Sequence, residues 1–163
     1  MSSSNSKLIN KFKEVNNLEI ISSHSDIKRL SKDFYNYSPV LTEILDNCIA
    51  DFVVRPSDYE AVKKVAEICY EFSVPLTLRG SGTGNYGQAV PLFKGIVMQM
   101  NYLNKLEEFS PETGFVKVQP GCLMGDLNKE LEQYGRELRL LPSTWKTATI
   151  GGFIAGGSGG IGS

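Results

Sequence analysis

The feature that most constrains the fold of this chain is a glycine-rich segment placed directly after a short apolar run. The segment reads RGSGTGNYGQAVP, spans residues 79–91 and follows the run PLTL. Glycine concentrated in one place indicates backbone that bends sharply or approaches another group closely. A second glycine-rich segment, ATIGGFIAGGSGGIGS, occupies residues 148–163. A fold proposed for this sequence has to explain both segments.

The first segment matches the GxGxxG spacing of the Rossmann dinucleotide-binding motif at Gly82, Gly84 and Gly87. That motif requires a helix that begins inside the loop, so that a pyrophosphate lies at the helix N-terminus. Here Pro91 and a β-rich stretch follow, and no crossover helix separates the loop from Glu107, the candidate ribose ligand. We therefore reject the Rossmann interpretation and expect no helix to begin between residues 80 and 87. The spacing is also unspecific, because it recurs at Gly157, Gly159 and Gly162.

The first glycine-rich segment suits a ligand with anionic oxygens, and the small residues of the second would let its backbone lie flat against a planar or extended ligand. Successive backbone N–H groups of the first segment can point into one concavity, and Ser81 and Thr83 add hydroxyl donors. Each N–H bonded to a charged oxygen contributes about 1.5–3 kcal/mol, so four of them hold a pyrophosphate without a basic side chain. The alternatives are a tight turn between strands for the first segment and a flexible tail for the second. Eight loop residues exceed what a turn needs, and Ile and Phe are unusual in a linker.

The hydrophobic pattern predicts a mixture of helices and strands. A strand at 52–55, a helix that begins with Ser57 as N-cap in a capping box with Glu60, and a strand at 75–79 form a βαβ unit with parallel strands. We expect the other elements in this order: a disordered tip at 1–6, helices at 7–16 and 25–35, a connector around Pro39, a strand at 95–100, a hairpin of 103–109 with 115–118, and a helix from Leu123 that ends at Gly135.

Composition excludes several classes of function. The net charge of −1 gives no electrostatic reason to bind nucleic acid or an anionic membrane. No run approaches the ~18 apolar residues of a membrane helix, and the polar N-terminus has no apolar signal core. The three cysteines lie far apart without CxxC spacing, so we expect free thiols in a reducing compartment and no metal site. The expected location is cytoplasmic.

Four stretches in order resemble a known family: ADFVVRPSDYEAV, PLTLRGSGTGNYGQAVP, VKVQPGCLMGDLNKEL and LPSTWKTATIGGFIAGGSGG. They resemble the FAD-binding domain of the vanillyl-alcohol oxidase and p-cresol methylhydroxylase superfamily, in particular the FAD-linked dehydrogenases of the glycolate oxidase type. The resemblance implies an α+β fold with two subdomains and FAD extended between them. We expect an N-terminal helical extension at 1–45 and the FAD-binding domain at 46–163, with a first subdomain at about 51–109 and an incomplete second one at about 114–163. Relatives continue into a cap domain that holds the substrate, so we expect a fragment whose residues 148–163 are poorly protected from hydrogen exchange.

The resemblance also implies a set of cofactor-binding residues. The first segment contacts the pyrophosphate, and the second follows the ribityl chain and the flavin ring. The positions carried over are Arg79, Gly80, Ser81, Gly82, Thr83, Gly84, Asn85, Tyr86, Pro142, Ser143, Ala148, Thr149, Gly151, Gly152, Ile154 and Gly156. This sequence differs from the family at two places expected near the flavin ring. Phe153 stands where many relatives have Asn, and Gly156-Gly157-Ser158 replaces a common Thr-Asn-Ala.

The expected mode of FAD binding is non-covalent. Some relatives link the flavin to a histidine in the first segment, and aligned by Arg79 that position is Thr83 here. The only histidine, His24, lies in the N-terminal extension, and Cys122 has no evident positive neighbour that would make it a thiolate. A threonine hydroxyl suits a hydrogen bond to a phosphate oxygen instead.

The resemblance implies a dehydrogenase or oxidase that takes hydride from a small hydroxy acid or alcohol onto the flavin, which performs the redox chemistry. The sequence identifies no catalytic acid or base, and Tyr86 and Trp145 are interpreted as packing residues. Substrate contacts would come from the cap domain or from a partner chain. Two alternatives stay open: a non-catalytic FAD- or nucleotide-binding module, and an inactive truncated product.

Overall fold

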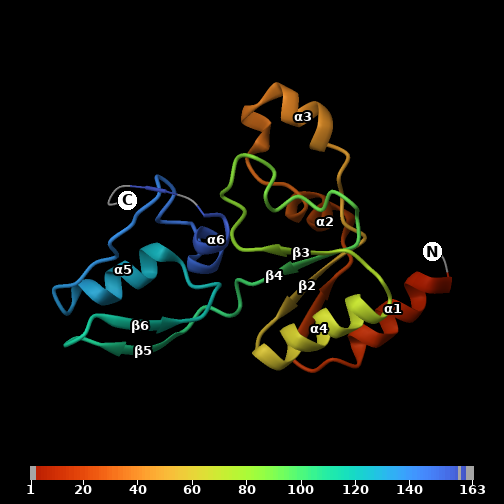
Figure 1. Ribbon diagram of the computed structural model, residues 1–163. Coiled ribbons are helices and arrows are strands. Elements are labelled where there is room, and N and C mark those ends of the chain that lie inside the picture. Colours follow the sequence, from red (N-terminus) through yellow and green to blue (C-terminus); the bar gives the residue numbers. More distant parts are fainter. Residues whose placement is uncertain (1–2, 158, 161–163) are drawn as a thin grey trace.

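A four-stranded sheet carries the first of two lobes of the molecule (Figure 1). The computed structural model describes residues 3–157 and 159–160. The strand order is β1-β2-β4-β3. The strands are β1 (Leu18–Ile21), β2 (Phe52–Pro56), β3 (Leu76–Arg79) and β4 (Ile96–Gln99). β1 is antiparallel to β2, whereas β2 and β3 both run parallel to β4, which lies between them.

The predicted βαβ unit is confirmed. Helix α4 (Tyr59–Glu71) connects β2 to β3, and the two strands are parallel. Residues 80–95 run without a helix from β3 to β4, so the Rossmann interpretation is correctly rejected. The predicted N-cap is wrong by one residue: Asp58, not Ser57, caps α4 by accepting a hydrogen bond of 2.7 Å from the Ala61 N–H.

Helices cover both faces of this sheet. α1 (Ser3–Lys13) and α4 pack on one face, and α2 (His24–Leu30) packs on the other. Leu8 and Phe12 of α1 join Val65 of α4 in a buried cluster with the strand residues Phe52, Val54, Ile96 and Met98. On the opposite face, Ile27 and Leu30 of α2 pack against Val53 and Val97. The segment before residue 50 therefore supplies part of the core of this lobe.

The N-terminal segment differs from the sequence prediction in three ways. Helix α1 begins at Ser3, within the stretch predicted to be a disordered tip. Residues 18–21, which we did not predict as a strand, form β1 at the edge of the sheet, so the segment predicted as helical also contains a strand. The predicted connector around Pro39 contains a 3-10 turn, η1 (Tyr35–Tyr37), and helix α3 (Pro39–Leu45). Pro39 occupies the first turn of α3, where its missing N–H is not needed, and Ser38 is the N-cap.

The second lobe packs a hairpin against helix α5 (Met124–Glu132). Strands β5 (Leu106–Ser110) and β6 (Phe115–Val118) form the predicted antiparallel hairpin. Side chains of both strands pack on Leu127 and Leu131 of α5, so β5 packs with β6 in this lobe. The predicted glycine-rich loop at 148–160 is wrong in part, since Ile150–Ala155 form a short helix, α6. Thr149 caps α6 by accepting from the Gly152 N–H, although two glycines in its first turn disfavour a helix by about 1 kcal/mol each.

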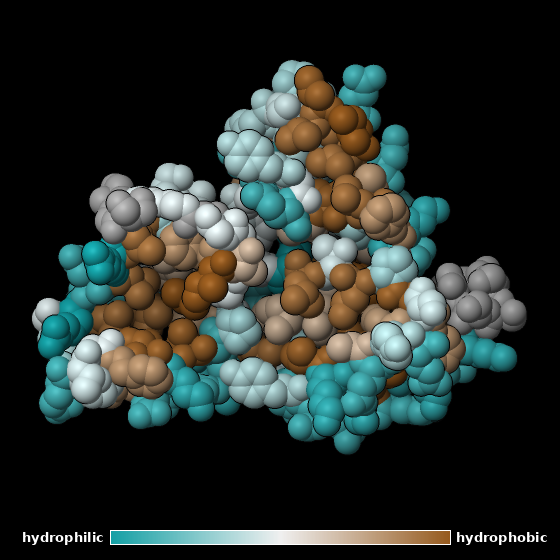
Figure 2. All heavy atoms as spheres, viewed as in Figure 1, coloured by the Kyte–Doolittle hydropathy of each residue, from teal (hydrophilic) through white to brown (hydrophobic). Residues whose placement is uncertain are grey.

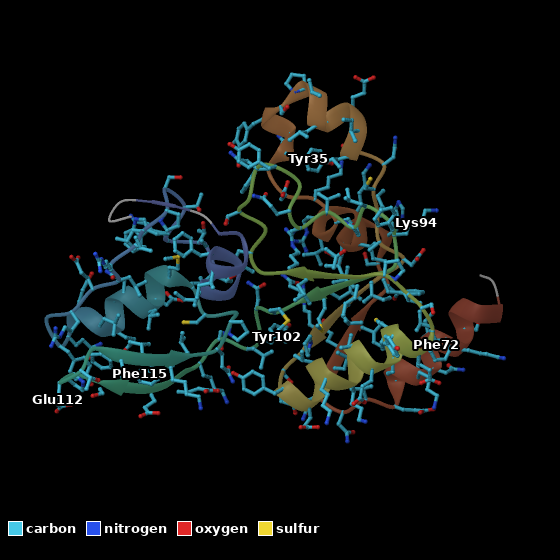
Figure 3. All side chains as sticks on the ribbon, viewed as in Figure 1. Tyr35, Phe72, Lys94, Tyr102, Glu112 and Phe115 are labelled. Carbon is cyan, nitrogen blue, oxygen red and sulfur yellow. The ribbon has the colours of Figure 1, made fainter. Side chains whose placement is uncertain are left out.

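Short polar contacts hold the two lobes together. The Gly121 N–H donates to the Leu103 carbonyl at 2.7 Å, and the Tyr59 hydroxyl on α4 donates to the Glu107 Oε1 on β5 at 3.2 Å. Tyr102, labelled in Figure 3 between the lobes, places its ring 5.6 Å from the Arg55 guanidinium. In the part of the chain that the structure describes, none of the helices has the length and apolar character needed to cross a membrane.

Candidate functional site: the cleft between the lobes

The two glycine-rich segments face each other across a cleft of about 760 Å³. Figure 2 shows a hollow in the surface between the second lobe and the part of the first lobe that carries α3. All but one of the residues predicted to contact a cofactor line this cleft: Arg79, Gly80, Ser81, Gly82, Thr83, Gly84, Asn85, Tyr86, Pro142, Ser143, Ala148, Thr149, Gly151, Gly152 and Gly156. The exception is Ile154, which is 72% exposed and is not part of the lining.

The first segment presents unused backbone donors. No backbone N–H of residues 80–85 donates a hydrogen bond to any group in the described part of the chain. Gly82 and Gly87 have φ angles of +72° and +81°, in the left-handed region that glycine adopts without steric cost. A loop with free N–H groups and this backbone geometry can surround anionic oxygens.

The Arg79 guanidinium lies beneath this loop and is 7% exposed. Its Nη1 donates to the Lys32 carbonyl at 2.6 Å and its Nη2 donates to the Ser81 carbonyl at 3.4 Å. A Cβ on Gly82 would overlap the guanidinium, so glycine at this position leaves room for Arg79. Burial lowers the pKa of Arg79, and the negative charge of Asp33 acts in the opposite direction. Arg79 therefore connects the loop to the end of α2.

Residues from the N-terminal segment support the loop from the other side. The Phe34 N–H donates to the Gly84 carbonyl at 2.8 Å, and Asp33 lines the cleft while its Oδ1 accepts from the Tyr35 N–H at 2.9 Å. This contribution was not predicted, because the segment before residue 46 was expected to be an extension. Nor were these lining residues predicted: Leu78, Gln88, Ala89, Met100, Pro120, Thr144, Phe153, Ala155 and Gly159.

The two glycine-rich segments meet at Gly80 and Thr149. A Cβ on Gly80 would overlap the Thr149 Oγ1, so only glycine permits this approach. Thr149 is 2% exposed and pairs with Leu123 in an antiparallel bridge, and the Met124 N–H donates to the Ala148 carbonyl at 2.9 Å. The start of α5 thereby holds the second segment against the first.

The residues considered for covalent flavin attachment or packing lie in different places. His24 begins α2, is exposed and lies outside the cleft lining. Cys122 is buried, its thiol donates to the Leu123 carbonyl at 3.6 Å, and burial raises its pKa. Thr83 lines the cleft, as does Tyr86, which is 72% exposed. Trp145 lies outside the lining, with Lys146 over its ring.

Comparison with protein families gives a match to the FAD binding domain over residues 50–163. Glycolate oxidase subunit GlcD of Bacillus subtilis is 34% identical over 111 residues, which are 68% of this chain and 24% of that protein. D-2-hydroxyglutarate dehydrogenase of Escherichia coli is 35% identical over 136 residues, 78% of this chain and 13% of that protein. D-lactate dehydrogenase of Anaerostipes hadrus is 32% identical over 111 residues, 68% of this chain and 23% of that protein. This chain thus spans a quarter or less of the length of these relatives.

Solved structures share the fold. An alkyldihydroxyacetonephosphate synthase superposes with a TM-score of 0.80 at 19% identity, covering 95% of this chain and 30% of the other. p-Cresol methylhydroxylase with substrate bound superposes with a TM-score of 0.74 at 17% identity, covering 94% of this chain and 30% of the other. The α+β fold predicted from the sequence, of the p-cresol methylhydroxylase type, is confirmed by this similarity.

Proposed function

This chain belongs to the family of FAD-binding domains, and we propose that it binds FAD non-covalently in the cleft between its lobes, within an oxidoreductase that acts on a small hydroxy acid. The observation that carries the proposal is the set of N–H groups at residues 80–85 that have no acceptor in the described part of the chain, in residues that line a cleft of about 760 Å³. Backbone donors in such a loop suit the two charged phosphates of a dinucleotide.

The residues of the cleft fit FAD along its length. The first segment would hold the pyrophosphate, because its donors are free and Cβ atoms at Gly80 and Gly82 would overlap neighbouring side chains. Pro142, Ser143 and the residues from Ala148 to Gly156 that line the cleft would follow the ribityl chain and ring. The bound flavin would supply the redox chemistry by accepting hydride, and the protein would position it and shield it from water.

Non-covalent binding is supported by the side chains around the cleft. Thr83 stands at the position where a histidine would be needed for a covalent link, and the described lining holds neither histidine nor cysteine. The thiols of Cys69 and Cys122 are buried, and burial raises the pKa of Cys69 to about 11. Thiols held in the neutral form are poor nucleophiles.

The substrate class follows from the relatives. Glycolate, lactate and 2-hydroxyglutarate, which appear in the names of the three relatives, are all 2-hydroxy acids. We therefore propose a 2-hydroxy acid as the substrate. Because the relatives are at least four times longer than the matched region, we place the substrate contacts in a further domain or in a partner chain.

A flavin titration tests the proposal. Purified chain is mixed with FAD, and the change in flavin absorbance and fluorescence is measured. We expect saturable binding, and acid precipitation should leave the yellow colour in the supernatant. Yellow colour that remains with the denatured pellet contradicts non-covalent binding, and an absence of binding contradicts the proposed function. Anaerobic addition of glycolate or D-lactate then distinguishes a catalytic unit, which bleaches the flavin, from a binding module.

A further inference from the structure

The floor of the cleft contains a buried carboxylate with an unused acceptor. Asp33 is 8% exposed and lines the cleft. Its Oδ1 accepts from the Tyr35 N–H, but its Oδ2 has no hydrogen-bond partner among the residues that the structure describes. A buried polar atom without a partner is energetically unfavourable, more so when it is charged, so a partner for Oδ2 is expected.

A buried donor without a partner belongs to Arg79, which also lines the cleft. The Nε of Arg79 has no acceptor in the described part of the chain, although both of its terminal nitrogens donate. Asp33 is the negative charge that acts on Arg79. Both side chains lie against the loop glycines: a Cβ on Gly82 would overlap the guanidinium, and a Cβ on Gly84 would lie 3.5 Å from the Asp33 Oδ2. Two residues that line the cleft thus carry one unpaired acceptor and one unpaired donor next to the loop glycines.

A hydroxyl group is the ligand chemistry that this pair fits. It can donate its proton to a carboxylate oxygen and accept from an N–H. A phosphate oxygen cannot donate and would face the Asp33 charge, whereas a ring N–H can donate to the carboxylate but cannot accept at the same atom. Dinucleotide cofactors carry such hydroxyls on the ribose and, in FAD, on the ribityl chain.

Building on the proposed function, we propose that Asp33 is a cofactor-binding residue whose Oδ2 accepts a hydrogen bond from a ribose or ribityl hydroxyl of FAD. Asp33 lies outside residues 50–163, the region that matches the family. Its role would be to select a hydroxylated ligand over a bare phosphate, because the carboxylate stabilises the former and repels the latter.

The variant Asp33→Asn tests this role. Asparagine has the same shape and can still accept from the Tyr35 N–H, while its NH₂ replaces the acceptor at the Oδ2 position. We expect the affinity for FAD to fall about tenfold or more, since hydrogen bonds to charged groups are among the stronger ones. The affinity for inorganic pyrophosphate should stay the same or rise, because a negative charge is removed. Asp26→Asn on α2, outside the cleft lining, is the matched control and should leave both affinities unchanged.

A ligand series identifies the hydroxyl and remains informative if the variant unfolds. FAD analogues that lack ribose hydroxyls or ribityl hydroxyls are titrated into wild-type protein and into Asp33→Asn. The analogue without the partner hydroxyl should bind wild type about tenfold more weakly than FAD, and the substitution should not weaken it further. If no deoxy analogue binds wild type more weakly than FAD, or if Asp33→Asn binds FAD as tightly as wild type, the inference is wrong. If wild type binds no FAD at all, the proposed function is wrong, and the role of Asp33, which depends on it, is wrong as well.

Discussion

Gly82 and Gly114 adopt nearly the same backbone conformation in different surroundings. Their φ angles are +72° and +73°. A Cβ on Gly82 would overlap the Arg79 guanidinium, whereas a Cβ on Gly114 would meet nothing within 4 Å. Alanine substitutions at the two positions therefore separate the free-energy cost of a left-handed backbone from the effect of displacing the loop at residues 80–85.

We expect Gly82→Ala to weaken FAD binding about tenfold, because the loop must shift and one N–H bond to a phosphate oxygen is lost. Gly114→Ala introduces the same backbone strain, about 1–2 kcal/mol, in the hairpin turn. It should lower the unfolding midpoint and leave the affinity for FAD unchanged. Flavin fluorescence titration and thermal unfolding of both variants check this, and equal FAD affinities for the two would contradict it.

Asp58 and Ser57 form a second informative pair. Asp58 accepts from the Ala61 N–H, whereas the Ser57 hydroxyl donates to the Asn17 carbonyl at 3.2 Å. We expect Asp58→Ala to lower the unfolding midpoint by about 2–4 °C, because the helix loses its cap, and Ser57→Ala to have the smaller effect. Thermal unfolding of the two variants decides which residue is the cap.

The cap also makes stability depend on pH. The Ala61 N–H and then the Asn17 amide hold the pKa of Asp58 below its ordinary value. A lowered folded-state pKa means that the contribution is present above the unfolded-state pKa of about 3.9 and is lost as the pH falls through the folded-state pKa. The difference in midpoint between wild type and Asp58→Ala should therefore shrink below pH 4.

At the scale of single residues, the glycines that line the cleft are visible in the sequence because glycine is restricted there for a local reason. Gly82 needs positive φ, and Gly80 allows close contact with Thr149, and both requirements leave a trace in the sequence. Asp33 left no such trace. Its place in the cleft depends on a tertiary contact between the end of α2 and a loop some fifty residues later, which no local pattern encodes.

At the scale of elements, the strands and helices with strong periodicity were predictable, and the weak ones were not. The βαβ unit and the hairpin are confirmed because apolar spacing and turn residues mark them. Strand β1 is short and gains its stability from pairing with β2, and α6 contains two glycines and depends on the Thr149 cap. Strand β1 is thus decided by a contact with a distant strand, and α6 by a local cap that offsets its glycines, so helix and strand propensities alone predict neither.

Helix α1 provides a test of whether the N-terminal segment belongs to the folded unit. Phe12 is fully buried in the cluster that includes Val65 and Ile96. We expect Phe12→Ala to lower the free energy of unfolding by about 3–5 kcal/mol, because a large cavity opens in the core. Tyr70→Ala on the exposed face of α4, where the side chain is 89% exposed, is the control and should change it by less than about 0.5 kcal/mol. Urea denaturation measures both changes. If Phe12→Ala left the free energy of unfolding unchanged, α1 would be a separable extension.

At the scale of the whole molecule, the ligand would connect the two lobes, because residues of both line the cleft. Residues 80–85 of the first lobe and α6 of the second lobe line opposite sides of the cleft. Helix α6 is six residues long and buries none of them, so we expect its amides to exchange rapidly in the free protein. The sequence led to the same expectation for 148–163, of which Ser158 and residues 161–163 lie outside the described part.

Binding of FAD should slow hydrogen exchange in both segments together. The N–H groups of residues 80–85 have no protein acceptor in the described part of the chain, so they are unprotected until phosphate oxygens accept from them. Local opening of α6 would have to break contacts with the ligand as well as its own hydrogen bonds, and its protection should rise with FAD concentration. The turn around Gly114 is far from the cleft lining and serves as an internal control whose exchange should not change. Mass spectrometry of exchange with and without saturating FAD measures all three regions. Protection confined to residues 80–85 would mean that the ligand lies on the first lobe alone, and the cleft would then not be the FAD site.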